Sequence, residues 1–430
     1  MHAFSYDHSH RNNNISRWKD MDSRHERARA FLDYKISDIL LTAVVAVMPL
    51  CSLIDYFIFK GLTIAGLSVC NFLLSAILLI STLLNIAEPK RRGDQFLLAG
   101  VLLFVTLLGK IVLQPLGDLP VWLSGHEYYF LVPLFAFCYA NLATRQAPDL
   151  IGILLTIALP VCGLSLYFFL TSDYLGMVPH EIMLAYDVVG MPFMRMMGTF
   201  GSPNVAGSYF AVLLFLDLQG APTSSAIVLL RRTLLAICLF LTFSRMAIIG
   251  FLIAELLFFL RNKKSYSRKV GFSAVRVLIA IVGFFAICAL FVSLSSRGLY
   301  FFDLTNDDAT NNLRFSKWAA FLLNGSDAIL LGEPIGSSYV YGGFTLSDNS
   351  LLCSIASFGL AIAVLYWTLL FHAFKNSREG KIAIEPFLMV LVFLFLSDFI
   401  QLFPSCYCAV LLLSFSSSNQ SNYHSKEGIS

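Results

Sequence analysis

Four residues of types that bind phosphate or move protons stand beside long apolar runs of the sequence: Arg195, Arg245, Arg314 and Asp348. A guanidinium group binds a phosphate through two parallel hydrogen bonds. A carboxylate can take the proton from an attacking hydroxyl group. A pyrophosphate leaving group needs charge stabilisation more than it needs a proton donor. The four residues therefore favour transfer from a pyrophosphate-linked lipid, without a metal or another cofactor.

Each of these residues also has a simpler interpretation. Arg195 precedes the run that ends at Pro203-Asn204, where the chain re-enters an apolar segment, and an arginine there could bind lipid headgroups. Arg245 follows a tight turn, and its side chain could extend to the membrane surface. Asp348 stands at the start of an apolar run, where aspartate serves as a helix N-cap. From single residues these alternatives stay open, and the combination favours an enzyme.

Composition indicates the elements that must position these residues. The chain has 430 residues, of which 57% are hydrophobic and 13% charged, and its mean hydropathy is +0.73. Soluble domains carry about 25% charged residues. Apolar runs of about 20 residues are membrane spans, so we expect an all-α polytopic membrane protein with about 12 spans. They are expected at about 38–59, 62–87, 96–116, 128–143, 150–170, 203–218, 225–242, 245–260, 273–294, 348–374, 384–401 and 403–416.

The distribution of Lys and Arg predicts the orientation. Most of the 30 basic residues fall on one side when residues 1–35 form a cytoplasmic basic tail. Residues 36–416 then form the transmembrane bundle, with long periplasmic loops at 171–202 and 295–347, and residues 417–430 form a disordered cytoplasmic tail. The basic residues that remain in a span or on the outer side are Lys60, Lys110, Arg195, Arg245, Arg297, Arg314 and Lys317.

Several classes of function are excluded by what the sequence lacks. It has no P-loop, no GxGxxG after a strand and no HExxH. Its nine cysteines lie within or beside predicted spans and outside the two long loops, which argues against a disulfide framework and a zinc site. We expect no metal, no cofactor and no nucleic-acid partner.

Short patterns around the arginines resemble those of the bacterial O-antigen polymerase (Wzy) and O-antigen ligase superfamily. The patterns are Arg195…Gly198…Gly201-x-Pro203-Asn204, then Ser244-Arg245, and then Asn312-x-Arg314…Trp318 before a glycine turn. Polymerases of this family often carry Arg-x10-Gly in both long loops. Arg314 and Gly325 keep that spacing, whereas the glycine after Arg195 comes one residue late, at Gly207.

The ligases of this superfamily are the close alternative. They typically carry His, then Asn, Ser or Gln, then nine residues and Gly, at the start of the span after the second loop. Here Asp348, Asn349 and Gly359 keep the spacing, but aspartate replaces the histidine. A lipid-linked glycan transporter (a flippase) is a further alternative, and it would need charges deep in several spans. Lys110 and Glu255 are the main charges of that kind.

The resemblance implies a GT-C-like, metal-independent, inverting glycosyltransferase of the bacterial inner membrane. Its donor would be an undecaprenyl-diphosphate-linked glycan, moved onto a new lipid-linked repeat unit of an O-antigen, capsule or exopolysaccharide. Bilayer lipids and a chain-length regulator are the other expected partners. Arg195, Arg245 and Arg314 would hold the donor, and Asp348 would be the base or would orient the acceptor. The expected substrate-binding residues are Asn204, Asn349, Lys317 and Lys110.

Overall fold

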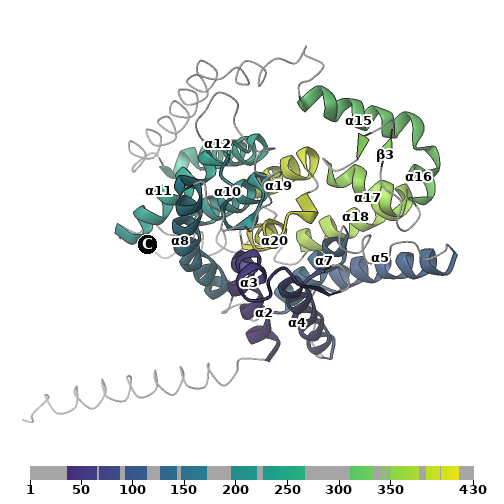
Figure 1. Ribbon diagram of the computed structural model, residues 1–430, viewed down its shortest axis with the longest axis horizontal. Coiled ribbons are helices and arrows are strands. Elements are labelled where there is room, and N and C mark those ends of the chain that lie inside the picture. Colours follow the sequence, from purple (N-terminus) through teal and green to yellow (C-terminus); the bar gives the residue numbers. More distant parts are fainter. Residues whose placement is uncertain are drawn as a thin grey trace, which may run out of the picture.

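In the computed structural model of the chain, the apolar runs of the sequence become helices (Figure 1). The structure describes residues 36–64, 67–87, 93–113, 126–142, 147–171, 195–219, 226–266, 310–333, 340–341, 344–345, 349–376, 384–397 and 399–415. These residues are mostly helical. The predicted span at 273–294 and both predicted tails lie outside them, as does most of the predicted loop at 171–202.

Four helical stretches are long and apolar enough to cross a membrane. They cover Ile36–Phe57, Val69–Ile86, Asp94–Val112 and Leu150–Thr171. Their outer faces carry exposed leucine, valine, isoleucine and phenylalanine side chains, which water would disfavour and lipid accepts. The chain is therefore an α-helical, membrane-embedded protein.

The first half of the chain forms helices α2 to α8. The elements are α2 (Ile36–Val47), η1 (Met48–Leu50), α3 (Cys51–Phe57), α4 (Val69–Ile86), α5 (Asp94–Leu113), α7 (Glu127–Asn141) and α8 (Ala147–Thr171). Pro49 lies in the 3-10 turn η1, which separates α2 from α3, because proline has no N–H to donate to the helix. A hairpin of β1 (Thr63–Ile64) and β2 (Leu67–Ser68) connects α3 to α4.

The second half supplies the centre of the bundle and the described part of the second long loop. The elements are η2 (Gly198–Phe200), α10 (Pro203–Gln219), α11 (Ala226–Leu241), α12 (Arg245–Tyr266), α15 (Thr310–Asn324), α16 (Ser326–Leu331), β3 (Val340–Tyr341), β4 (Phe344–Thr345), α17 (Ser350–Phe358), α18 (Leu360–Asn376), α19 (Ile384–Leu396), η3 (Phe399–Gln401) and α20 (Ser405–Phe415). The two short hairpins are small additions to the expected all-α fold.

Every predicted span other than 273–294 overlaps a described helix. Some of these spans are interrupted, and the span predicted at 38–59 contains the 3-10 turn η1. The run at 348–374, predicted as a single span, is two helices, α17 and α18, which meet at Gly359. This glycine has a φ of 83°, a conformation that glycine adopts without a side-chain clash. A helix end therefore lies inside the predicted span.

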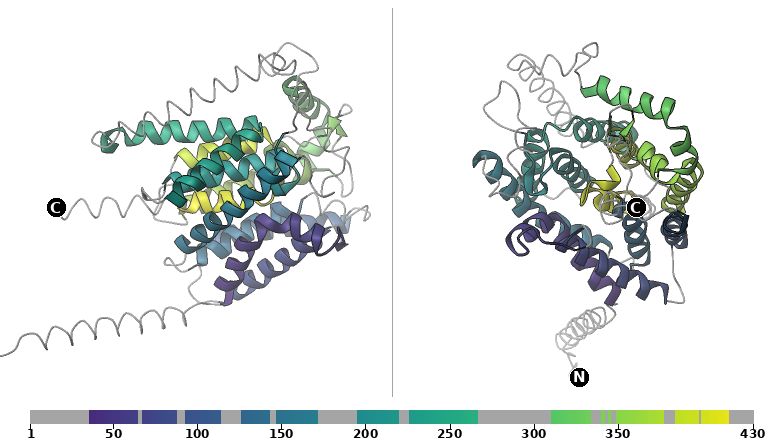
Figure 2. Two further views of the ribbon diagram at one scale, coloured as in Figure 1. Left: turned by 60° about the vertical axis from the view of Figure 1, so that its left-hand side comes forward. Right: turned by 45° about the vertical axis from the view of Figure 1, so that its right-hand side comes forward.

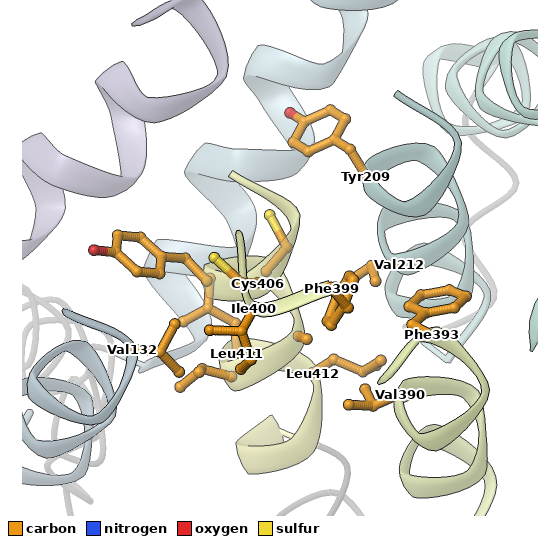
Figure 3. Close-up of a cluster of buried hydrophobic side chains, with 14 of the residues drawn as sticks. Val132, Tyr209, Val212, Val390, Phe393, Phe399, Ile400, Cys406, Leu411 and Leu412 are labelled. Atoms are coloured by element: carbon orange, nitrogen blue, oxygen red, sulfur yellow. The ribbon is translucent and has the colours of Figure 1, made fainter. Parts of the chain in front are cut away.

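Helix α10 lies at the centre of the bundle. It is buried on nearly all sides and packs against α11, α12 and α20. Figure 2 shows the teal α10 and α12 alongside the yellow α19 and α20, with the purple α2 to α4 on the other side. A cluster of apolar side chains from α7, α10, α19 and α20 fills the space between these helices (Figure 3). This core fixes where the first residues of α10 and α12 lie.

Candidate functional site

Arg195 joins the end of the first long loop to the turn between α11 and α12. Its Nε donates to the backbone oxygen of Thr242 at 3.0 Å, and its Nη2 donates to that of Phe243 at 3.2 Å. These carbonyls follow the C-terminal end of α11, where a cation is favoured. The next residue, Met196, donates its N–H to the oxygen of Leu241 at 3.0 Å. The arginine therefore holds the loop against the end of α11.

Asn204, in the first turn of α10, connects Arg195 to the start of α12. Its Oδ1 accepts from Arg195 Nη2 at 3.4 Å and from Ser244 Oγ at 3.2 Å. Ser244 directly precedes Arg245, the first residue of α12. Arg245 is half-buried. We call Arg195, Asn204, Ser244 and Arg245 the arginine cluster. The structure thus brings together three of the residues that the sequence singled out, from three separate segments.

Gly207 explains how α10 comes so close to the α11–α12 turn. A Cβ atom at this position would lie 2.6 Å from Ser244 Cβ, 2.9 Å from Thr242 Oγ1 and 3.0 Å from Ala247 Cβ. Real Cβ atoms do not approach other atoms so closely. Packing therefore requires glycine at position 207, although this position lies one residue beyond the Arg-x10-Gly spacing.

Asn349 occupies the N-cap of α17. Its Oδ1 accepts from the backbone N–H groups of Leu351 and Leu352, both at 3.0 Å, and its Nδ2 donates to the oxygen of Phe395 at 3.1 Å. The N-cap that the simpler interpretation assigned to Asp348 is thus filled one residue later. Asp348 itself lies outside the described residues.

Ser397, just after α19, connects the start of α17 to the start of α12. Its backbone oxygen accepts from the N–H of Ser350 at 3.0 Å and from the Ser350 hydroxyl at 3.2 Å. Its own hydroxyl donates to Met246 Sδ at 2.9 Å. Met246 follows Arg245, and Ser350 follows Asn349. The N-terminal ends of α10, α12 and α17 therefore converge on one region.

Arg314 and Lys317 are in α15, on the second long loop. Helix α15 packs against α16 and β3, and α16 packs against α17 and α18. Figure 1 shows α15 and α16 as an arch above α17. The structure does not describe the side chain of Arg314, and Lys317 is half-buried. Gly325, the partner of Arg314 in the Arg-x10-Gly spacing, separates α15 from α16, and a Cβ there would lie 2.6 Å from the oxygen of Phe321.

Lys110 lies at the opposite end of α17 from Asn349. Its ammonium donates to the backbone oxygens of Glu333 at 2.6 Å and Ser357 at 2.8 Å. These carbonyls follow the end of α16 and lie in the last turn of α17, so the cation binds at two helix C-termini. The predicted substrate-binding residue therefore attaches the second loop to α5 in this structure.

The sequence reasoning passed over a group of residues at the start of α7. Tyr129 donates its hydroxyl to the oxygen of Ser350 at 2.9 Å and accepts, on its own backbone oxygen, from the hydroxyl of Tyr366 at 2.9 Å. His126 is buried beside Tyr129. Glu127 has a buried Oε2 without a hydrogen-bond partner among the described residues. The sequence does carry a signal for this group, because two ionisable residues, His126 and Glu127, stand immediately before an apolar run.

The electrostatics of the converging helix ends favour an anion. The N-terminal end of a helix carries about half a positive charge, and three such ends meet here together with the arginine cluster. Guanidinium groups are donors that hold phosphate in many proteins, whereas the first N–H groups of α17 already donate to Asn349 and Ser397. The arrangement can therefore bind a negatively charged group and stabilise charge that develops on it.

Comparison of the chain with protein-family models, with curated proteins and with solved structures found no match.

Proposed function

We propose that the protein is a polysaccharide polymerase that transfers an undecaprenyl-diphosphate-linked glycan onto a new lipid-linked repeat unit. The convergence of the arginine cluster with the N-terminal ends of α10, α12 and α17 carries this proposal. The reaction takes place at the periplasmic face of the bacterial inner membrane. A GT-C-like bundle of about 12 spans, cytoplasmic termini and an associated chain-length regulator belong to the same proposal.

In this reaction, a hydroxyl group of the acceptor sugar attacks the anomeric carbon of the donor glycan. The bond from that carbon to the diphosphate oxygen breaks, and the diphosphate leaves on its lipid with the bonding electrons. Asp348 takes the hydroxyl proton, and Arg245 and Arg314 stabilise the charge on the diphosphate. Arg195 and Asn204 hold the turn after which α12 begins with Arg245.

The ligase, which transfers finished polymer to lipid A–core, stays the second candidate. Its support is the spacing from Asn349 to Gly359. Asn349 is the N-cap of α17, and Gly359 is its C-cap. The transporter has less support. Lys110, one of its two main mid-span charges, donates to backbone carbonyls and serves packing.

The test is polymer formation in a bacterial host from which the gene has been deleted. Arg245→Ala and Asp348→Asn should each abolish chain elongation at normal protein level and leave single-repeat product on a silver-stained gel. Arg261→Gln is the matched control, because Arg261 is on the same helix as Arg245 but pairs with Glu385. It should give the wild-type pattern.

Two outcomes decide against the polymerase. Near-wild-type polymer from Arg245→Ala or Asp348→Asn would remove the assigned site. Full-length polymer that stays on undecaprenyl diphosphate in the deletion host would identify the ligase instead.

A further inference from the structure

Three side chains with metal-binding atoms meet where α3 and α4 come together. They belong to Cys51, Asp55 and Cys70, and one ligand atom from each lies within 4.8 Å of the other two. Both thiols are buried, with 3% and 4% of their residues exposed, and Asp55 is half-buried. This is the one such group among the residues that the structure describes.

Local structure explains why these residues meet. Cys51 is the first residue of α3, and Asp55 follows one helical turn later, on the same face. The hairpin of β1 and β2 reverses the chain and brings Cys70, the second residue of α4, against that face. Asp55 Oδ1 accepts the backbone N–H of Cys70 at 2.7 Å, which holds the start of α4 in place.

In contrast to the expectation from the cysteine positions in the sequence, we propose that Cys51, Cys70 and Asp55 form a site for one divalent ion that prefers thiolate ligands, such as Zn²⁺. Zinc binds sulfur at about 2.3 Å and oxygen at about 2.0–2.2 Å in a tetrahedron. Neighbouring ligand atoms around one ion are then about 3.3–3.8 Å apart. The three ligand atoms, all within 4.8 Å of one another, need only small movements to reach that spacing.

Asn71 can supply a fourth ligand. Its Oδ1 accepts from Cys51 Sγ at 3.2 Å, so an oxygen already points at the group. On binding, the two thiols release two protons to solvent, and the ion takes their place as the partner of the two sulfurs. The Asn71 oxygen, relieved of the thiol proton, can turn to the ion.

The surroundings favour a metal over a disulfide. A disulfide would use the two sulfur atoms alone, whereas a carboxylate oxygen of Asp55 lies within 4.8 Å of both and the amide oxygen of Asn71 accepts from one of them. Cys162 and Cys238 form a useful contrast. They bring two buried thiols into contact between α8 and α11, and no carboxylate of the described residues joins them.

The site lies behind the loop that carries Arg195. Cys51 follows η1 directly, and the hydroxyl of Thr199 in η2 donates to the oxygen of Pro49 in η1 at 3.2 Å. An ion that fixes α3 to α4 would therefore steady the surface against which this loop rests. The ion has a structural role, and the proposal stands independently of the proposed function.

The test uses the purified full-length protein in detergent, with thiols kept reduced by a phosphine and metal first removed by a chelator. Cd²⁺ is the probe, because its bonds to thiolates give a charge-transfer absorption in the ultraviolet. The metal-free wild type should bind about one added Cd²⁺ per chain. When Zn²⁺ is added instead, elemental analysis should find about one Zn²⁺ per chain. Cys51→Ser and Cys70→Ser should each abolish the absorption. Asp55→Asn should weaken binding by at least about tenfold.

The matched control is the double variant Cys162→Ser, Cys238→Ser, which should bind Cd²⁺ as the wild type does. Variants are compared as single symmetric peaks in size-exclusion chromatography. Asp55→Asn is nearly isosteric and keeps the proposal testable if a serine variant does not fold. The proposal fails if the reduced wild type binds no Cd²⁺, if the serine variants bind it equally, or if a Cys51–Cys70 disulfide persists in the reductant.

Discussion

The two ends of helices α10, α11 and α12 both hold arginines, but the atoms that accept their hydrogen bonds differ. In the arginine cluster, Arg195 donates to two backbone carbonyls of the α11–α12 turn and to the amide oxygen of Asn204. At the other end, Arg231 forms a two-pronged ion pair with Asp217, at 2.7 and 2.8 Å. Among the contacts of the described residues, Arg195 thus binds neutral oxygens and Arg231 binds a carboxylate.

The second end contains further pairs of the same kind. Arg232 Nε lies 3.5 Å from Asp217 Oδ1, and its Nη2 donates to the backbone oxygen of that residue. Arg261 in α12 pairs with Glu385 in α19 at 3.3 Å. We call Asp217, Arg231, Arg232, Arg261 and Glu385 the ion-pair end. With a rise of about 1.5 Å per residue, Arg245 and Arg261 are about 24 Å apart along α12.

The comparison separates arginines that hold helices together from arginines suited to a ligand. A carboxylate neutralises a guanidinium and holds it, so the arginines of the ion-pair end are structural. Carbonyl and amide oxygens orient a guanidinium without cancelling its charge. At the arginine cluster the helix N-termini also add a positive field, which favours an anion there.

The largest expected effect comes from removing the shared carboxylate of the ion-pair end. Asp217→Ala removes the carboxylate that two mostly buried guanidinium groups share. Loss of one partner of a buried ion pair costs about 3–5 kcal/mol. We expect a large drop in the thermal midpoint of the detergent-solubilised protein and in its yield. Polymer formed per folded molecule should stay unchanged, and a selective loss of activity at normal stability would contradict the comparison.

The contact beneath the arginine cluster is tested by Gly207→Ala. The new methyl group would lie 2.6 Å from Ser244 Cβ and would force α10 away from the turn. Overpacking of this kind costs about 1–3 kcal/mol. Gly163→Ala in α8 is the control, since a Cβ there meets nothing within 4 Å. The two variants should differ in thermal midpoint, and equal midpoints would show that α10 and α12 are not in close contact.

A smaller effect is expected from Arg195→Lys. Lysine keeps the positive charge but has no planar fork, so it cannot serve both carbonyls of the turn and Asn204 together. We expect about a tenfold loss in the rate of polymer formation, equivalent to about 1.4 kcal/mol. Arg195→Gln, which removes the charge as well, should lose more. If the two variants lose the same amount, the geometry of the guanidinium matters and its charge does not.

Helix positions in this region follow from the sequence, because their signals are local. The predicted spans at 203–218 and 225–242 match α10 and α11 within one residue at each end. Proline at the first position of α10 and an arginine after a tight turn at α12 mark those starts. The fold class follows from composition for a similar reason, since long apolar runs have few other stable states.

The contacts of the side chains do not follow from the sequence, because they join distant segments. Lys110 donates to Glu333 and Ser357, more than 200 residues away, and no local pattern of the sequence links these residues. The break at Gly359 was hidden in a continuous apolar run. The meeting of Cys51 with Cys70 depends on a hairpin whose strands have two residues each, too short for a pattern of alternating residues.

The smallest effect is expected for the pair of Arg261 and Glu385, and it measures how far the ion-pair end depends on solvent. The carboxylate side chain is 2% exposed, but the guanidinium side chain is 41% exposed, so water screens the attraction. A double-mutant cycle with Arg261→Gln, Glu385→Gln and both changes should give a coupling energy of about 0.5–1 kcal/mol. The same cycle for Arg231 and Asp217, whose side chains are 14% and 4% exposed, should give a larger value. If the two cycles agree, burial does not set the strength of these pairs, and the distinction between the two ends rests on the arginine cluster alone.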